Sequence, residues 1–291
     1  MDETTSLFLN ALVSGLLLAG FYAAMSVGIA IAFGMLDVVN IAHPAFIVLG
    51  SYVAYMMNSW LGADPILVAV ALSPAFFLLG AAIYRIYYLA FERRGQESLR
   101  GLAFFFGILF ITEVALILIF GVDYRLVTTR YTDVTLRPGG IDLPLRLAVP
   151  FLVSLAMTLG LRALLAKTFF GRTVLAVAQD PFALQLMGVS PVRVKQWAFA
   201  LSLATAGVAG ALLIVIQPVQ PSLGREYIGL VFAVTVLGGL GSIYGTLAGA
   251  AILGVAESFT STFFGPSWAP AVSFGLLLAA LALRPAGLFG R

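Results

Sequence analysis

A group of polar residues interrupts the apolar N-terminal part of this chain and raises the first question about its chemistry. The stretch LDVVNIAHPAF, residues 36–46, contains Asp37, Asn40 and His43, and His43 is the only histidine in the sequence. A carboxylate, a carboxamide and an imidazole are costly to place in apolar surroundings unless they find hydrogen-bond partners. Asn40 and His43 are therefore expected either to meet a solute or to hold the local backbone together, and Asp37 is expected to be a solvated or capping carboxylate.

Glu113 is the second unusual residue, because it lies near the middle of the apolar run 102–122. A charge there is expensive and often functional, so we expect it to be neutral or paired with a polar group of another segment. With one histidine, no cysteine and no cluster of carboxylates in the apolar runs, neither a metal site nor a nucleophilic triad can be assembled. The chain is thus predicted not to be an enzyme and to bind no metal or cofactor of its own.

The composition indicates the kind of protein that positions these groups. Hydrophobic residues make up 61% of the chain and charged residues 10%, against about 25% charged residues in a typical soluble domain. The mean hydropathy is +1.05. The apolar runs are long and continuous rather than alternating, which favours helices over a membrane barrel. The sequence predicts an all-α polytopic membrane protein, with no nucleic acid among its partners since no basic stripe with interleaved aromatics is present.

About eight runs are long enough to cross a membrane as helices of roughly 20 residues. The runs are 6–33, 42–60, 65–91, 102–122, 143–165, 192–216, 227–237, 244–263 and 269–283, of which 227–237 is at best half a crossing. The intervening GGLGS, residues 238–242, favours broken helices, because glycine tolerates close approach and unusual dihedral angles. We expect one membrane domain over residues 1–291, with a broken or re-entrant segment near 227–263.

The positions of lysine and arginine predict the orientation, since cytoplasmic loops carry an excess of both. Three groups are assigned to the cytoplasm: Arg85, Arg93, Arg94 and Arg100; Arg162, Lys167, Arg172, Arg193 and Lys195; and Arg284 with Arg291. Counting crossings then places the N-terminus and residues 123–142 outside, and residues 166–191 and the C-terminus in the cytoplasm. The outer loop keeps four arginines, so the bias is present but not complete.

The cytoplasmic segment has readable helix boundaries. Asp180 suits an N-cap, Pro181 suits the first helical position, and Gly188 suits the residue just past a helix end. Ser190 and the proline after it repeat the same start for the next helix. A short helix over 181–187 is predicted, and its side chains are mostly apolar: Phe182, Leu184, Leu186 and Met187. Such a helix is expected either to bind a partner protein or to lie on the bilayer surface.

This segment resembles the coupling loop of ABC-importer permeases, in which a glycine, an Ala-x-Asp pair and a second glycine occur in this order. The matching residues are Gly171, Ala178, Asp180 and Gly188. The chain as a whole is most similar to the branched-chain amino acid permease family, the LivH-like group. NIAHPAF, the glycine-rich stretch 236–258 and the C-terminal RPAGLFGR resemble further motifs of that family, in the family's order. Pro44 departs from it, because a glycine usually follows the histidine.

The resemblance implies an ABC-importer permease fold and a function in inner-membrane import of branched-chain or neutral amino acids, or of a related small polar solute. It implies a second related permease, two ATP-binding subunits and a periplasmic solute-binding protein as partners, in the inner membrane of a bacterial cell. ATP would be used by the partner subunits, because this chain has no Walker-type phosphate-binding sequence. The segment 171–191 would couple to them through Gly171, Arg172, Ala178, Asp180, Pro181, Leu184, Met187 and Gly188. The alternative is a stand-alone secondary transporter of a small organic solute.

Candidates for a translocation path come from the polar and glycine-rich positions. They are Asn40, His43, Glu113, Gly238, Gly239, Gly241 and Ser242. Ser242 could cap the following helix and present its N-terminal amides to a carboxylate. Each candidate also has a structural alternative. Asn40 and His43 could cap the helix that starts at residue 44 or 45, Glu113 could make a structural hydrogen bond, and the glycines could only allow helices to cross closely.

Overall fold

The computed structural model describes residues 3–95, 98–284 and 286–290, so Pro285 and Arg291 of the C-terminal motif lie outside the described residues. The elements are α1 (Glu3–Ala32), α2 (His43–Leu61), α3 (Pro65–Ala90), η1 (Glu92–Arg94), α4 (Ser98–Phe120), β1 (Thr135–Leu136), η2 (Pro138–Gly140), β2 (Leu143–Pro144), α5 (Leu145–Lys167), α6 (Phe169–Gln179), α7 (Pro181–Leu186), α8 (Pro191–Ile216), α9 (Leu223–Gly238), α10 (Ile243–Phe263), η3 (Pro266–Trp268) and α11 (Ala269–Leu283). The predicted all-α fold is confirmed.

Seven helices of the described ranges are long and apolar enough to cross a membrane. They are Glu3–Ala32, Pro65–Arg94, Leu99–Phe120, Leu145–Lys167, Pro191–Ile216, Ile243–Phe263 and Pro266–Leu283. The difference from the eight predicted lies in run 42–60, which forms α2 but is not among the seven. This helix carries His43, Ser51, Asn58 and Ser59, which lower its hydropathy. The protein is a multi-pass membrane protein.

The centre of the bundle is built from α1 and α8, which are almost wholly buried, with α2 and α3 packed against α8 and α10 against α1. Small residues allow these close approaches, as is usual where helices associate in lipid. A Cβ on Gly210 of α8 would overlap the carbonyl oxygen of Ile47 in α2. The Ser51 hydroxyl also donates to the Gly210 carbonyl at 2.7 Å, which ties the same two helices together.

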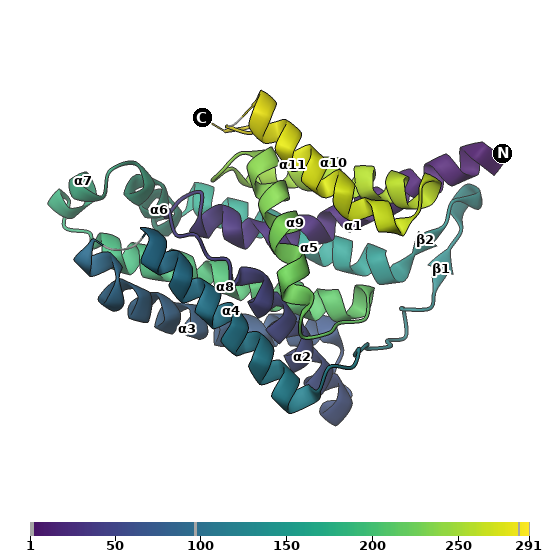
Figure 1. The fold of residues 1–291 in the computed structure, drawn as a ribbon, viewed down its shortest axis with the longest axis horizontal. Coiled ribbons are helices and arrows are strands. Elements are labelled where there is room, and N and C mark those ends of the chain that lie inside the picture. The colour runs from purple at the N-terminus through teal and green to yellow at the C-terminus, as the bar shows by residue number, and fades with distance from the viewer. Residues whose placement is uncertain (1–2, 96–97, 285, 291) are drawn as a thin grey trace.

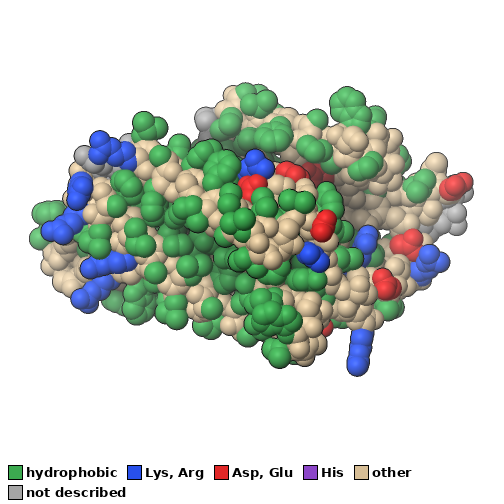
Figure 2. Space-filling view, turned by 60° about the horizontal axis from the view of Figure 1, so that its bottom comes forward, with side chains coloured by type: hydrophobic (Ala, Val, Ile, Leu, Met, Phe, Trp, Pro, Cys, Tyr) green, Lys and Arg blue, Asp and Glu red, His purple; other side chains and the backbone are tan. Residues whose placement is uncertain are grey.

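The two ends of the bundle differ in structure and in charge. In Figure 1, α7 lies at one end, whereas the N-terminal end of α1 and the β1–β2 pair lie at the other. The pair is antiparallel, with Thr135 opposite Pro144 and Leu136 opposite Leu143. Lys and Arg side chains gather at the α7 end in the face shown in Figure 2, and the opposite end mixes both signs. This distribution is the one expected if the α7 end faces the cytoplasm.

Candidate functional site

The predicted coupling helix is present and starts where its sequence indicated. The Asp180 Oδ1 accepts hydrogen bonds from the backbone N–H groups of Phe182, at 2.9 Å, and Ala183, at 3.0 Å. Pro181 occupies the first helical position, and Gly188 has a φ of 78°, the left-handed conformation that favours glycine. The helix ends at Leu186, one residue earlier than predicted. Ser190 stands at the N-cap position of α8, but the expected side-chain cap is absent.

The side chains of α7 divide into one anchor and an exposed apolar patch. Leu184 is only 2% exposed and fixes the helix to the body of the protein. Phe182, Leu186 and Met187 are 68%, 75% and 71% exposed. We call these three residues the α7 patch. Three large apolar side chains held outward on a capped helix form a surface suited to binding a partner.

The rest of the coupling segment supports this helix. Gly171 is buried at the start of α6 and its Cα faces the backbone of Leu165, so a side chain there would overlap it. The Thr168 hydroxyl oxygen accepts from the Gly171 N–H at 3.1 Å and caps α6. Arg172 and Ala178 are exposed on α6, which directly precedes α7 in the chain. The segment 171–191 thus presents exposed residues of both short helices at the end of the bundle.

The connector before α2 turns back into the protein interior, where Asn40 and His43 are fully buried. The Asn40 Oδ1 accepts from the Ala42 N–H at 3.2 Å, and the His43 Nε2 lies 3.2 Å from the Met25 carbonyl oxygen, to which it can donate. The expectation that they cap the helix is wrong, because Ala42 is the N-cap residue of α2 and no side chain accepts a hydrogen bond from the N–H groups of its first turn. They tie backbone groups of α1 and the connector together, whereas Asp37 is exposed, at a φ of 56°.

The glycine-rich turn between α9 and α10 is closed by the C-terminal tail. Gly239 has a φ of 103° and Gly241 a φ of 79°, which explains why glycine is needed at both positions. The N–H groups of Leu288 and Phe289 donate to the carbonyl oxygens of Leu237, at 2.9 Å, and Gly238, at 3.0 Å. The tail therefore satisfies carbonyl groups at the end of α9 that the helix leaves unpaired.

The same glycines face neighbouring backbone atoms rather than open space. A Cβ on Gly238 would overlap Gly245 of α10, and one on Gly239 would overlap Gly290 of the tail. Gly241 lies against the backbone of Gly34, just past α1. This arrangement favours close packing in the conformation described. Ser242 caps α10 as expected, since its hydroxyl oxygen accepts from the Gly245 N–H at 3.0 Å.

Glu113 is paired across helices, which was one of the two expectations for it. Its Oε1 lies 2.8 Å from a guanidinium nitrogen of Arg225 at the start of α9. The Glu113 side chain is 8% exposed and that of Arg225 is 50% exposed. A charge in the middle of α4 is therefore matched by a cation that reaches it from a more open position.

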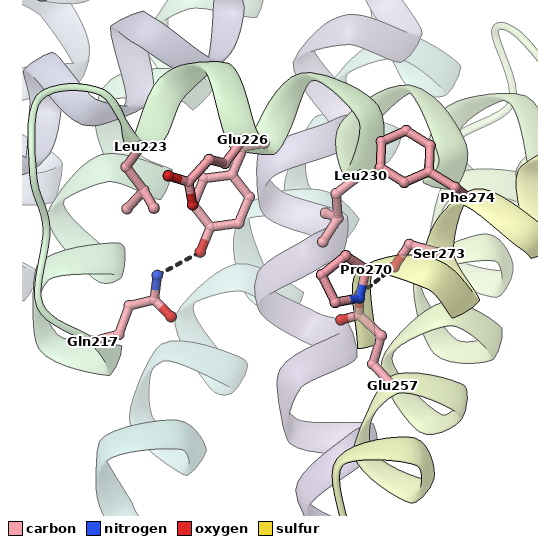
Figure 3. Close-up of a pocket in the computed structure, with 9 residues that line it drawn as sticks. Gln217, Leu223, Glu226, Leu230, Glu257, Pro270, Ser273 and Phe274 are labelled. Atoms are coloured by element: carbon pink, nitrogen blue, oxygen red, sulfur yellow. Dashed lines mark hydrogen bonds between the residues drawn. The ribbon is translucent and has the colours of Figure 1, made fainter. Parts of the chain in front are cut away.

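A cavity of about 180 Å³ that the sequence analysis did not identify lies between α9, α10 and α11. Figure 3 shows its lining: Gln217, Leu223, Glu226, Tyr227, Leu230, Glu257, Pro270, Ser273 and Phe274. Glu257 is buried. It accepts hydrogen bonds from the hydroxyls of Tyr22 and Ser273. The lining residues are spread over almost 60 sequence positions, so no local motif marks this cavity. The one signal for it in the sequence is Glu257, an acidic residue inside an apolar run.

Comparison with known proteins adds independent information. A family model described as "Branched-chain amino acid transport system / permease component" matches residues 11–281. Pseudomonas aeruginosa BraD, a high-affinity branched-chain amino acid transport system permease protein, is 28% identical over 98% of this chain and 96% of its own. Escherichia coli LivH, of the same description, is 28% identical over 100% of this chain and 98% of its own. Salmonella typhimurium LivM is 26% identical over 92% of this chain and 67% of its own. No solved structure matches the chain significantly.

Proposed function

This chain belongs to the family of branched-chain amino acid transport system permease components, and from that membership we propose that it is the membrane subunit of an ATP-driven importer of branched-chain or other neutral amino acids. It resides in the inner membrane, with its N-terminus outside and its C-terminus in the cytoplasm. The basic residues at the α7 end support this orientation. The relatives reported above support the substrate class, since each is named for branched-chain amino acid transport.

The observation that carries the proposal is the α7 patch. Three outward apolar side chains on a short capped helix are suited to a hydrophobic groove of another protein. The chain has no Walker-type sequence, so ATP would be hydrolysed by a separate subunit. The groove that receives the α7 patch would belong to that ATP-binding subunit. Movement of that subunit during ATP hydrolysis would reach the bundle through Leu184, the buried anchor of the helix.

The complete complex contains a second permease, two ATP-binding subunits and a periplasmic solute-binding protein. The similarity to both LivH and LivM supports a pair of related permeases, because two related permease types resemble the same chain. The solute-binding protein would deliver the amino acid to the end of the bundle that carries β1 and β2. Glu113, Asn40 and His43 then serve mainly to hold the bundle together in the state described.

Co-purification tests this assignment directly. The tagged chain, expressed in its native host, should retain an ATP-binding subunit through detergent extraction. The double variant Phe182→Ser and Leu186→Ser should lose that subunit while its amount in the membrane is unchanged. The control is Val134→Ser with Leu136→Ser, two exposed apolar residues at the opposite end, and it should retain the subunit. Wild-type protein that transports without any ATP-binding subunit would instead establish a secondary transporter.

A further inference from the structure

The cavity between α9, α10 and α11 combines apolar and polar lining residues. The apolar ones are Leu223, Leu230, Pro270 and Phe274. The polar ones are Gln217, Glu226, Tyr227, Glu257 and Ser273. Figure 3 shows Glu226 and Glu257 on different sides of the space, one on α9 and the other on α10. An apolar surface with a few convergent polar groups is the usual character of a small-molecule site.

Four of the five polar side chains of this cavity, those of Glu257, Ser273, Gln217 and Tyr227, are held by hydrogen bonds. Both oxygens of Glu257 accept hydrogen bonds, from the hydroxyls of Tyr22 on α1 and Ser273 on α11. The Gln217 amide donates to the Tyr227 hydroxyl at 2.7 Å. A carboxylate has about four lone-pair positions, so two hydroxyl donors leave the Glu257 carboxylate able to accept from a further donor.

The two carboxylates of the cavity lack a cationic partner within the part of the chain that the structure describes. Three ion pairs occur there, and none includes Glu226 or Glu257. Arg225, next to Glu226 in sequence, is engaged with Glu113 on α4. Glu257 is buried whereas Glu226 is exposed, and burial of a charge is costly unless an opposite charge compensates it. A cation entering the cavity would supply the opposite charge that Glu257 lacks.

The size and the approach to the cavity fit a small amphipathic molecule. A dry cavity of about 150 Å³ in another protein accepts benzene, so about 180 Å³ has room for a branched aliphatic group. A second hollow of about 530 Å³ shares Gln217, Leu223 and Glu226 with it and continues to Tyr124 and Gln220. That hollow opens beside the bridge between Arg125 and Val219, on the loop proposed to face outward.

We propose that this cavity binds a primary ammonium group attached to a short branched aliphatic chain, as found in a branched-chain amino acid. The ammonium group lies between Glu226 and Glu257, and the aliphatic group lies against Leu230 and Phe274. The assignment to a transported amino acid rests on the proposed function, whereas recognition of the ammonium group rests on the cavity itself. The site would receive the amino acid at the outer end of the bundle, before it enters the translocation path.

Binding to the purified complex in detergent, without the solute-binding protein, tests the site. The probes are isopentylamine, which has the ammonium group and the branched chain, and 4-methylpentanoate, which has the chain and a carboxylate. Ligand-observed NMR should detect isopentylamine on the wild-type complex and should detect 4-methylpentanoate at least about tenfold more weakly, which corresponds to about 1.4 kcal/mol.

Two variants make the result specific. Glu257→Gln should weaken isopentylamine binding about tenfold, and Glu226→Gln should weaken it as well. Glu226 is exposed, so its replacement is not expected to affect folding. The control Glu92→Gln removes a carboxylate at the other end of the bundle, where it pairs with Lys195, and should leave binding unchanged. Equal binding of amine and carboxylate, or unchanged amine binding in Glu226→Gln, would overturn the proposal.

The same preparations separate this inference from the proposed function. If the ATP-binding subunit co-purifies and leucine is taken up by vesicles reconstituted with the complex and supplied with the solute-binding protein, but isopentylamine does not bind, the cavity assignment alone is wrong. If isopentylamine binds and loses affinity in both variants, but no ATP-binding subunit is present, the cavity assignment holds and the importer assignment fails.

Discussion

Replacing Arg225 by Gln should destabilise the bundle, because the Glu113 carboxylate would keep its buried position and lose its counter-charge. Exposed ion pairs contribute about 0.2–1 kcal/mol, and breaking a buried pair costs about 3–5 kcal/mol. This pair falls between the two cases, since Glu113 is 8% and Arg225 50% exposed. We therefore expect a loss of about 2 kcal/mol. A chain of this size shifts its Tm by about 2–4 °C per kcal/mol, so Arg225→Gln should melt about 4–8 °C lower.

The double variant Glu113→Gln with Arg225→Gln isolates the pair from other effects. Its Tm should lie above that of Arg225→Gln alone, because a neutral amide is less costly on α4 than an unpaired carboxylate. The measurement is thermal unfolding of the purified protein in detergent, followed by fluorescence of its tryptophans. A double variant that melts at or below the temperature of Arg225→Gln would refute the reasoning. It would show that Arg225 acts through its own packing and not through Glu113.

Three further outcomes are expected. Asp180→Ala removes the cap of α7 and should lower the stability of this helix by about 1 kcal/mol. It should lower transport-stimulated ATP hydrolysis while leaving the amount of permease in the membrane unchanged, and unaltered stimulation would count against a coupling helix. Gly239→Leu should reduce the yield of folded protein because the new side chain displaces the C-terminal tail. The control Gly160→Leu, at a position with open space, should not reduce it, and equal yields of the two variants would exclude a packing role for Gly239. In this cysteine-free chain, Thr135→Cys should react with an impermeant thiol reagent in intact cells and Arg94→Cys should not, and the reverse labelling would invert the orientation.

The sequence predicted best those features that depend on neighbouring residues. The start of α7 follows from Asp180 and Pro181, and its end from Gly188, because capping is decided within one helical turn. The cap of α10 by Ser242 is of the same kind. The long apolar runs likewise predicted the membrane helices, since length and hydropathy are local properties.

Features that depend on distant contacts were not predictable in the same way. The burial of Glu257 depends on its contacts with Tyr22 of α1 and Ser273 of α11, and a single sequence does not show that these three residues meet. The glycines of residues 238–241 were identified as candidates for a path, which stays a prediction. Their contacts with the tail and with Gly34, which lie about 50 and 200 residues away in sequence, were not foreseen. Asn40 and His43 were identified as unusual, but their partners were not.

The attachment of the C-terminal tail has a consequence for how the protein is made. The carbonyl groups of Leu237 and Gly238 receive their hydrogen bonds from Leu288 and Phe289, which are translated about 50 residues later. At about 5–20 residues per second, the turn between α9 and α10 therefore waits about 2.5–10 s for its partners after it is synthesised. A chain that stops before residue 287 contains every one of the seven candidate spans but lacks the segment that locks this turn. Nascent chains of this protein thus acquire their final α9–α10 junction only after residues 288 and 289 have been synthesised, and a chain terminated before them keeps an unlocked junction.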